Sequence, residues 1–170
     1  MSEEGCKNIK GNASQYYVAA ELSRRGMVAA VTLGNCPNTD ILCSDPEGKH
    51  FAHVQVKTFQ VGNKKCAVGK KAERDYSSRF FWVLVGIPSD LTSAPIYYII
   101  PARVMARHVS ASFKVWLAKD GKHGPHDPKN PFRAVRVPPH RNLDRWSIKK
   151  YEGRWDLVEK KLVSKARHGS

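Results

Sequence analysis

Cysteine is scarce in this sequence of 170 residues, and the few cysteines follow no recognisable pattern. The four are Cys6, Cys36, Cys43 and Cys66, and none of them forms a CxxC pair. Disulfide scaffolds are small and dense in cysteine, and structural zinc sites need pairs of nearby ligands. We therefore expect free thiols, which excludes a disulfide-stapled scaffold and a zinc-finger type of site.

Long hydrophobic runs are also absent. No apolar stretch approaches the roughly 18 residues that are needed to cross a bilayer. The opening segment MSEEGCKNIKG is polar and lacks the apolar region of a secretory signal. The sequence has no internal repeat and is long enough to bury a core, so we expect a single domain over residues 1–170. We also expect the protein to be cytoplasmic and to have no membrane partner.

Acidic residues are few in comparison with basic ones. Asp and Glu number 15 against 29 Lys and Arg, which gives a formal net charge of +14. An excess of this size favours a polyanionic partner such as DNA, because binding releases counterions from the phosphate backbone. A solubilising surface is the alternative interpretation, and charge alone does not show whether the protein cuts what it binds.

Local patterns predict an α/β sandwich around one mixed sheet. The apolar run FFWVLVGI is typical of a central strand buried on both faces. Residues 60–79 are predicted to form a long basic loop, and residues 120–170 a loop and helix extension whose part at 120–142 is irregular. The predicted helices are 12–26, 102–109 and 151–162, and the predicted strands are 27–33, 40–44, 50–58, 80–87 and 94–101.

Polar side chains follow one face of the hairpin at 40–58. Side chains alternate along a strand, so Gln55 and Lys57 share a face with His53. If the turn is the four residues 45–48, residue 44 faces 49 and Asp40 lies opposite His53, on that same face. A slip of one residue would move Asp40 to the other face, so the pairing is a prediction about register.

A carboxylate, an amide oxygen and an ammonium on one surface match the needs of phosphodiester hydrolysis. Asp40 and the Gln55 oxygen can hold a hard divalent cation, and a lysine such as Lys57 can neutralise charge that develops on the phosphate. An ordinary polar sheet edge is the alternative, because the pattern is short. Glu21 has two interpretations as well: a surface ion pair with Arg25, or an acid that reaches the metal from the first helix.

These residues, in this order, resemble the PD-(D/E)xK nuclease superfamily, which has the restriction-endonuclease-like fold. The segments that carry the resemblance are YYVAAELSRRG, then CPNTDIL, then VQVKT, and the likeness covers about residues 11–100. The glutamine of QxK resembles the Mrr-type branch and small nuclease-like proteins of this group. The resemblance implies a restriction-endonuclease-like α/β/α sandwich around a mixed central sheet.

The resemblance also implies roles for individual residues. Asp40 would be the main ligand of Mg²⁺ (or Mn²⁺), with Gln55 and the Val56 carbonyl completing the shell. Lys57 would be the catalytic lysine and Glu21 an accessory acid and metal ligand. The chain departs from the family pattern at two points: Pro37 lies three residues before Asp40, and Gln55 replaces a glutamate, which removes a negative charge beside the metal.

The basic loop follows Lys57 directly and could clamp a phosphate backbone. Residues 64–75 carry five positive and two negative charges. No base-reading motif is present, so these charges favour positioning over sequence readout; a solvated loop is the alternative. Trp116, Trp146 and Trp155 could stack on bases or serve as packing anchors. The candidate contacts to nucleic acid are Lys64, Lys65, Lys70, Lys71 and Arg74.

Together these observations predict a Mg²⁺-dependent endonuclease that hydrolyses DNA. Two other functions remain open: a catalytically inactive nucleic-acid-binding module on the same fold, and a basic protein whose partner is RNA or an acidic protein. Double-strand cleavage by this fold usually implies two active sites, so we expect a homodimer.

Overall fold

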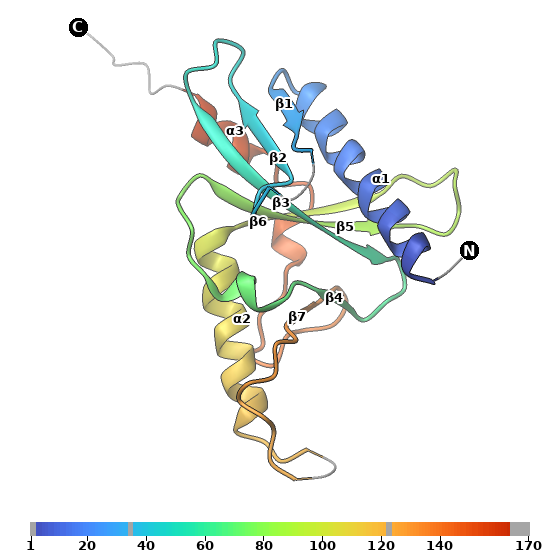
Figure 1. Cartoon of the computed structure of the whole chain (residues 1–170), viewed down its shortest axis with the longest axis vertical. Helices are drawn as coiled ribbons and strands as arrows, with labels where there is room; N and C mark the ends of the chain where they lie inside the picture. The colour runs from blue at the N-terminus through green and yellow to red at the C-terminus, as the bar shows by residue number, and fades with distance from the viewer. Residues whose placement is uncertain (1–2, 34–35, 122–123, 164–170) are drawn as a thin grey trace, which may run out of the picture.

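Five strands form a mixed sheet at the centre of the protein, in the order β1-β2-β3-β5-β6 (Figure 1). The structure is a computed structural model that describes residues 3–33, 36–121 and 124–163. Only β3 and β5 are parallel; the other neighbouring strands run antiparallel. The strands are β1 (Val28–Val31), β2 (Ile41–Ser44), β3 (Phe51–Gln60), β5 (Phe80–Ile87) and β6 (Ile96–Pro101).

Strand β5 is an interior strand that is buried on both faces, as its sequence predicts. It lies between β3 and β6, and its residues from Phe80 to Gly86 are all buried. A strand with neighbours on both edges and covered faces has no position for a polar side chain, which explains its continuous apolar run. The sequence-based prediction for this strand is therefore confirmed.

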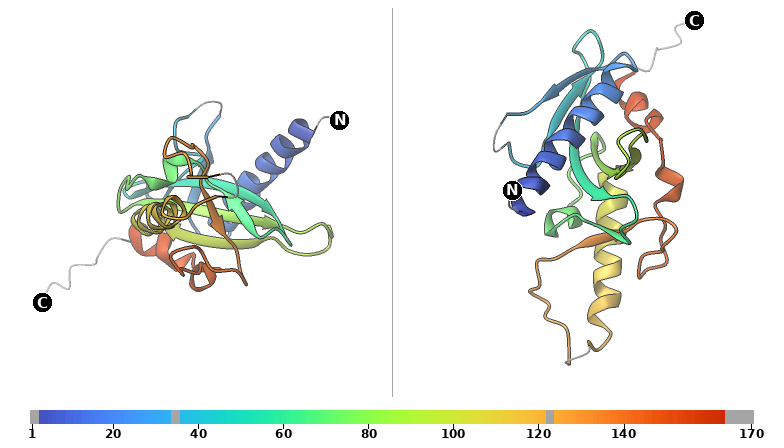
Figure 2. Two further views of the ribbon diagram at one scale, coloured as in Figure 1. Left: turned by 90° about the horizontal axis from the view of Figure 1, so that it is seen from below. Right: turned by 90° about the vertical axis from the view of Figure 1, so that its right-hand side faces the viewer.

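Two helices cover one face of the sheet. They are α1 (Glu3–Ser23) and α3 (Asp156–Leu162). Val18 and Leu22 of α1, four residues apart, pack with Val54 and Val83 of the sheet, and Trp155 joins this cluster beside α3. Figures 1 and 2 agree that α1 lies beside the half of the sheet that contains β1, β2 and β3.

The other face is covered by α2 (Ala102–Leu117) and by a two-stranded ribbon. The ribbon pairs β4 (Lys65–Ala67) with β7 (Ala134–Arg136), and two short 3-10 helices accompany it, η1 (Lys70–Glu73) and η2 (Lys149–Tyr151). Trp82, Tyr98 and Met105 lie in the core of this face. The three layers confirm the α/β/α sandwich around a mixed sheet.

Several boundaries differ from those predicted. Helix α1 spans 3–23 in place of 12–26, and α2 continues to Leu117 because neither glycine nor proline interrupts it after residue 109. Gly153, with φ of 63°, delays the start of the last helix to Asp156. The loops at 60–79 and 120–142 contain β4 and β7, which pair across a long sequence separation. Within the described ranges, no helix has both the length and the apolar content to cross a membrane.

Arg133 ties the ribbon, η1 and α2 together. Its side chain is only 4% exposed, and Nε donates a hydrogen bond of 2.6 Å to Glu73 of η1. The guanidinium lies 3.1 Å from the ring centroid of Phe113 on α2. The Arg133 carbonyl accepts the N–H groups of Val68 and Gly69 at 2.9 and 3.2 Å. Arg133 thus holds the basic loop at 60–79 against helix α2.

Replacing Arg133 by methionine is expected to lower the free energy of unfolding by about 2 kcal/mol, because Glu73 loses its largely buried partner. Urea denaturation followed by circular dichroism measures the change. The matched control is Lys149→Met, which breaks an exposed pair with Glu152 and should cost less than about 0.5 kcal/mol. Equal stabilities for the two variants would contradict this role of Arg133.

Candidate active site

Asp40 lies opposite Gln55. A four-residue turn predicts His53 as its partner, so the observed register differs from the predicted one by two residues. Ile41 pairs with Val54 and Ser44 with Phe51, so the expected pairing of Asp40 with His53 is wrong. The turn is longer because the Asp45 carboxylate accepts the N–H groups of Lys49 and His50, at 2.7 and 3.1 Å. A difference of two residues preserves the alternation, so Asp40 still lies on the Gln55 and Lys57 face.

The Asp40 carboxylate is held by two donors from β3. Its Oδ2 accepts a hydrogen bond of 2.7 Å from the Val56 N–H. The same oxygen accepts a hydrogen bond from Nε2 of Gln55. The backbone of Asp40 is fixed as well, because its N–H donates to Val54 and its carbonyl accepts from Thr32, both at 2.9 Å. The orientation of this carboxylate is therefore set by backbone and side-chain contacts together.

An open pocket of about 320 Å³ surrounds this carboxylate. Gln55 pairs with Trp82 on β5, whose indole is buried and forms part of the lining. Lys57 reaches the pocket from β3 and Lys71 from η1. Five lining residues are not among the site residues predicted from the sequence: Cys36, Pro37, Asn38, Val68 and Trp82. Trp82 could have been found only from the parallel pairing of β3 with β5, which leaves no local pattern.

Burial raises the pKa of Asp40 above its ordinary value. The Val56 N–H, the charge of Lys57, the Gln55 amide and the charge of Lys71 act in the opposite direction without cancelling the effect. A partly buried carboxylate in a cleft with specific charged neighbours is the kind of group that functional sites contain.

Glu21 does not lie in this pocket. Its two carboxylate oxygens pair with Arg24 and Arg25 at 3.1 and 3.2 Å. Helix α1 covers the face of the sheet that carries Val54 and Val56, whereas Gln55 and Lys57 point to the other face. Of the two interpretations of Glu21, the structure therefore agrees with the ion pair. The expected approach of Glu21 to Asp40 is not found.

The five basic candidates divide between different surfaces. Lys71 lines the pocket around Asp40. Lys70 lies beside it on η1, and Arg74 follows directly after η1. Lys64 and Lys65 belong to the β4 side, and Lys65 lines a separate pocket next to α2. Of the tryptophans, Trp146 and Trp155 are buried packing anchors, and Trp116 lines the pocket that contains Lys65.

The donors around Asp40 suit a weakly held magnesium ion. Within the described ranges no group of three or more His, Cys, Asp or Glu side chains is placed to bind a metal. Asp40 supplies one carboxylate. The N–H and carbonyl of a strand residue point to the same edge of the strand, so the Val56 carbonyl lies on the β2 side of β3, as its N–H does. Mg²⁺ is commonly bound by one or two carboxylates together with substrate phosphates, so this donor set fits it.

Comparison with known proteins supports the fold. No protein-family model matches the chain, and no curated protein matches it either. Among solved structures, that of a bacterial homing endonuclease, I-Ssp6803I, is similar with a TM-score of 0.53. The likeness covers 91% of this chain and 92% of that chain at 17% sequence identity. The chain therefore has a nuclease-like fold.

The raised pKa of Asp40 predicts a gain in stability when this residue cannot ionise. The native state keeps the proton to a higher pH than the unfolded chain, so the free energy of unfolding falls as pH rises through that interval. Asp40→Asn should therefore be more stable than the unmodified protein at pH 7. This advantage should shrink as pH falls below the Asp40 pKa. Urea denaturation between pH 4 and 7 measures it.

Asp45→Asn is the control of opposite sign. The hydrogen bond with His50 lowers the pKa of Asp45 in the native state. The ionised carboxylate therefore stabilises the native state at every pH above the pKa that Asp45 has in the unfolded chain. This variant should be less stable than the unmodified protein at pH 7. A loss of stability in Asp40→Asn at that pH would contradict the assignment of Asp40 as a carboxylate whose ionisation costs stability.

Proposed function

We propose that the protein is a Mg²⁺-dependent endonuclease that hydrolyses DNA phosphodiester bonds. The observation that carries the proposal is the gathering of Asp40, Gln55, Lys57 and Lys71 around one open pocket. The net charge of +14 suits a DNA partner. The nuclease-like fold supports the same reaction class, since it is the fold of an endonuclease.

In this proposal Asp40, Gln55 and the Val56 carbonyl hold the metal ion, and Mn²⁺ can replace Mg²⁺. When bound, the ion polarises the scissile phosphate and eases deprotonation of the attacking water. Gln55 donates Nε2–H to Asp40. A half-turn of its terminal amide exchanges nitrogen and oxygen, so the same side chain can present an oxygen ligand.

The two lysines act on the phosphate. Lys57 lies on the face of β3 that carries Gln55, where an ammonium can orient water or neutralise charge developing on the phosphate. Lys71 enters from η1 and acts electrostatically on Asp40 across the pocket. Lys70 and Arg74 lie beside Lys71. We propose that these three basic residues position the DNA backbone without reading bases. Glu21 has no place in this mechanism, because its carboxylate pairs with two arginines on the other face.

A catalytically inactive DNA-binding module is the second candidate. Among the residues that the structure describes, Asp40 is the only carboxylate in the lining of this pocket. The neutral Gln55 stands where an acid would strengthen metal binding. This module would bind DNA in a salt-dependent manner and leave it intact. For the active enzyme, one pocket cuts one strand, so we propose a homodimer where both strands are cut.

Plasmid cleavage with Mg²⁺ or Mn²⁺ tests the proposed activity. Lys57→Met and Asp40→Asn are each expected to slow nicking about 100-fold or more, because each removes a group that stabilises the transition state. Lys49→Met is the matched control, since Lys49 is an exposed lysine in the turn between β2 and β3. The ratio of nicked to linear product reports whether two sites act together.

Nicking by Lys57→Met at the rate of Lys49→Met would refute the catalytic assignment. Salt-sensitive binding without nicking by the unmodified protein would establish the inactive module in its place.

Replacing Gln55 by glutamate is expected to tighten Mg²⁺ or Mn²⁺ binding about 10-fold, because a second carboxylate joins the ligands. Without metal, the new charge lies beside Asp40, so the melting temperature should fall in EDTA and recover on adding the ion. Calorimetry and thermal melts measure the two effects. Gln55→Leu is the control, which should lose metal binding. No metal-dependent recovery in Gln55→Glu would contradict this ligand assignment.

A further inference from the structure

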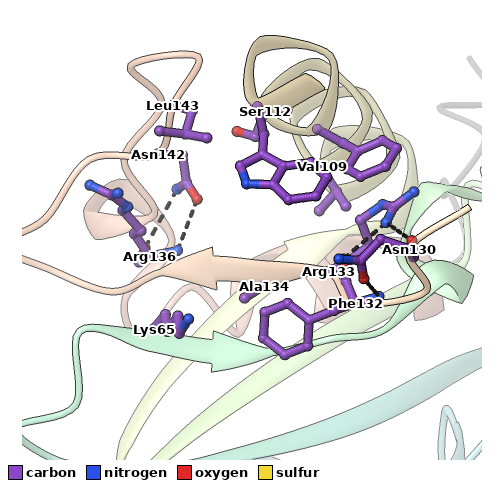
Figure 3. Close-up of a pocket in the computed structure, with 12 residues that line it drawn as sticks. Lys65, Val109, Ser112, Asn130, Phe132, Arg133, Ala134, Arg136, Asn142 and Leu143 are labelled. Carbon is purple, nitrogen blue, oxygen red and sulfur yellow. Dashed lines mark hydrogen bonds between the residues drawn. The ribbon is translucent and has the colours of Figure 1, made fainter. Parts of the chain in front are cut away.

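A second pocket of about 320 Å³ lies between α2 and the ribbon of β4 and β7. Figure 3 shows Val109 and Ser112 of α2 on one side of it, and Lys65 and Phe132 on the ribbon side. Its aromatic lining comes from Phe113, Trp116 and Phe132. Neither the PD-(D/E)xK resemblance nor the proposed catalytic residues assign a role to this pocket.

The uncharged polar side chains in this lining already have partners. Asn130 accepts the Phe132 N–H at 2.8 Å. Ser112 donates to Asp144 at 2.9 Å. The Asn142 amide donates to the Trp146 carbonyl at 3.2 Å and accepts the Arg136 N–H at 2.8 Å. The pocket therefore offers aromatic surface more than free hydrogen-bonding groups, so an occupant would be held by stacking and charge.

Two aromatic side chains present this surface. Phe132 is 52% exposed, so its ring is accessible at the mouth of the pocket. Trp116 stacks on His126, with ring centroids 3.8 Å apart and planes 13° apart, so its indole is held in a fixed orientation. Phe113 also stacks on Trp116, with ring centroids 5.4 Å apart. The exposed ring of Phe132, beside this fixed aromatic cluster, is the surface on which a base can stack.

Two cations stand at the ribbon side of the pocket. Lys65 and Arg136 are direct partners in the register of β4 and β7, and both are exposed. Like charges directly opposite each other are destabilising in a strand pair. In the described part of the chain neither side chain forms an ion pair. An anion between them would relieve this repulsion, and the Lys65 ammonium also lies 5.1 Å from the Phe132 ring centroid.

We infer that this pocket binds an unpaired nucleobase with its phosphate, on a single-stranded segment of DNA. Stacking surface beside paired cations is the combination that binds single strands, and every base has a π-face for it. In a duplex the faces of a base are already stacked, so only an unpaired or extruded base can enter. The inference rests on the proposed function and narrows its substrate to DNA with a single-stranded region near the cleaved bond.

The ribbon connects the two pockets. Lys65 lines the stacking pocket and Val68, three residues along the same chain, lines the pocket around Asp40. Three extended residues span about 10 Å, which is about three nucleotides along one strand of B-form DNA. Arg133 fixes the connection, since its carbonyl accepts the Val68 N–H and its side chain lines the stacking pocket. One strand could therefore occupy both pockets together.

Binding of a labelled oligothymidine, measured by fluorescence anisotropy in EDTA, tests this inference without requiring cleavage. Phe132→Leu is expected to weaken binding about 10-fold, and Phe132→Tyr, which keeps an aromatic ring, should bind nearly as the unmodified protein does. Tyr16→Leu is the matched control, because Tyr16 is an exposed aromatic residue on α1. Lys65→Met and Arg136→Met should each reduce the salt slope by about 0.7, and Lys49→Met should not.

The unmodified protein gives a second readout. Trp82, Trp146 and Trp155 are buried, so quenching of tryptophan fluorescence by the oligonucleotide would come from Trp116. We expect quenching by the single strand, and little by a duplex of the same length or by a mononucleotide at equal concentration.

Equal binding by Phe132→Leu and Phe132→Tyr would overturn the inference, and so would equal quenching by the duplex or the mononucleotide. The plasmid assay distinguishes failure of this inference from failure of the proposed nuclease function. Normal nicking with no effect of Phe132→Leu on binding refutes the stacking pocket alone. Absence of nicking with a clear effect of Phe132→Leu refutes the nuclease and leaves a single-strand binding site.

Discussion

The candidate site depends on the hydrogen bond from the Val56 N–H to the Asp40 carboxylate. This bond continues the contact between β2 and β3 beyond the last regular pair, where the side chain of Asp40 takes the place of a backbone acceptor. It fixes where β2 begins, and it keeps Asp40 on the face that carries Gln55 and Lys57. Removing the carboxylate from water is unfavourable, as the raised pKa of Asp40 shows.

The two layers that cover the sheet have different roles. The layer of α1 and α3 packs on the apolar side chains of β3 and β5, and its charged residues pair with one another at the surface, as Glu21 does with Arg24 and Arg25. The layer of α2 leaves space above Gln55 and Lys57, where η1 brings in Lys71. Both pockets that enter the proposals therefore lie on the α2 side of the sheet.

The parts of this arrangement that follow local rules could be predicted from the sequence. Strand β5 and the shared face of Gln55 and Lys57 follow from apolar run length and from the alternation of side chains. The register of the hairpin could not be predicted, because it depends on two backbone N–H groups that the Asp45 carboxylate binds. The position of Glu21 relative to the site depends on which face of the sheet α1 covers, and this is a tertiary property. The pairing of β4 with β7 joins two segments of three residues across a long separation, too short for any periodicity to reveal.

The glutamine at position 55 is consistent with a site that is completed by its substrate. A glutamate there would place a second carboxylate next to Asp40 in a partly buried position, and two such charges repel each other when no cation lies between them. Glutamine avoids this repulsion and donates to Asp40 instead. In the proposed nuclease, a site with one carboxylate would attract a dication only weakly until phosphate oxygens add their charge. In the proposed nuclease, binding of metal and DNA would therefore be coupled. The lysines and arginine that draw DNA to this side of the sheet would control catalysis as well as affinity.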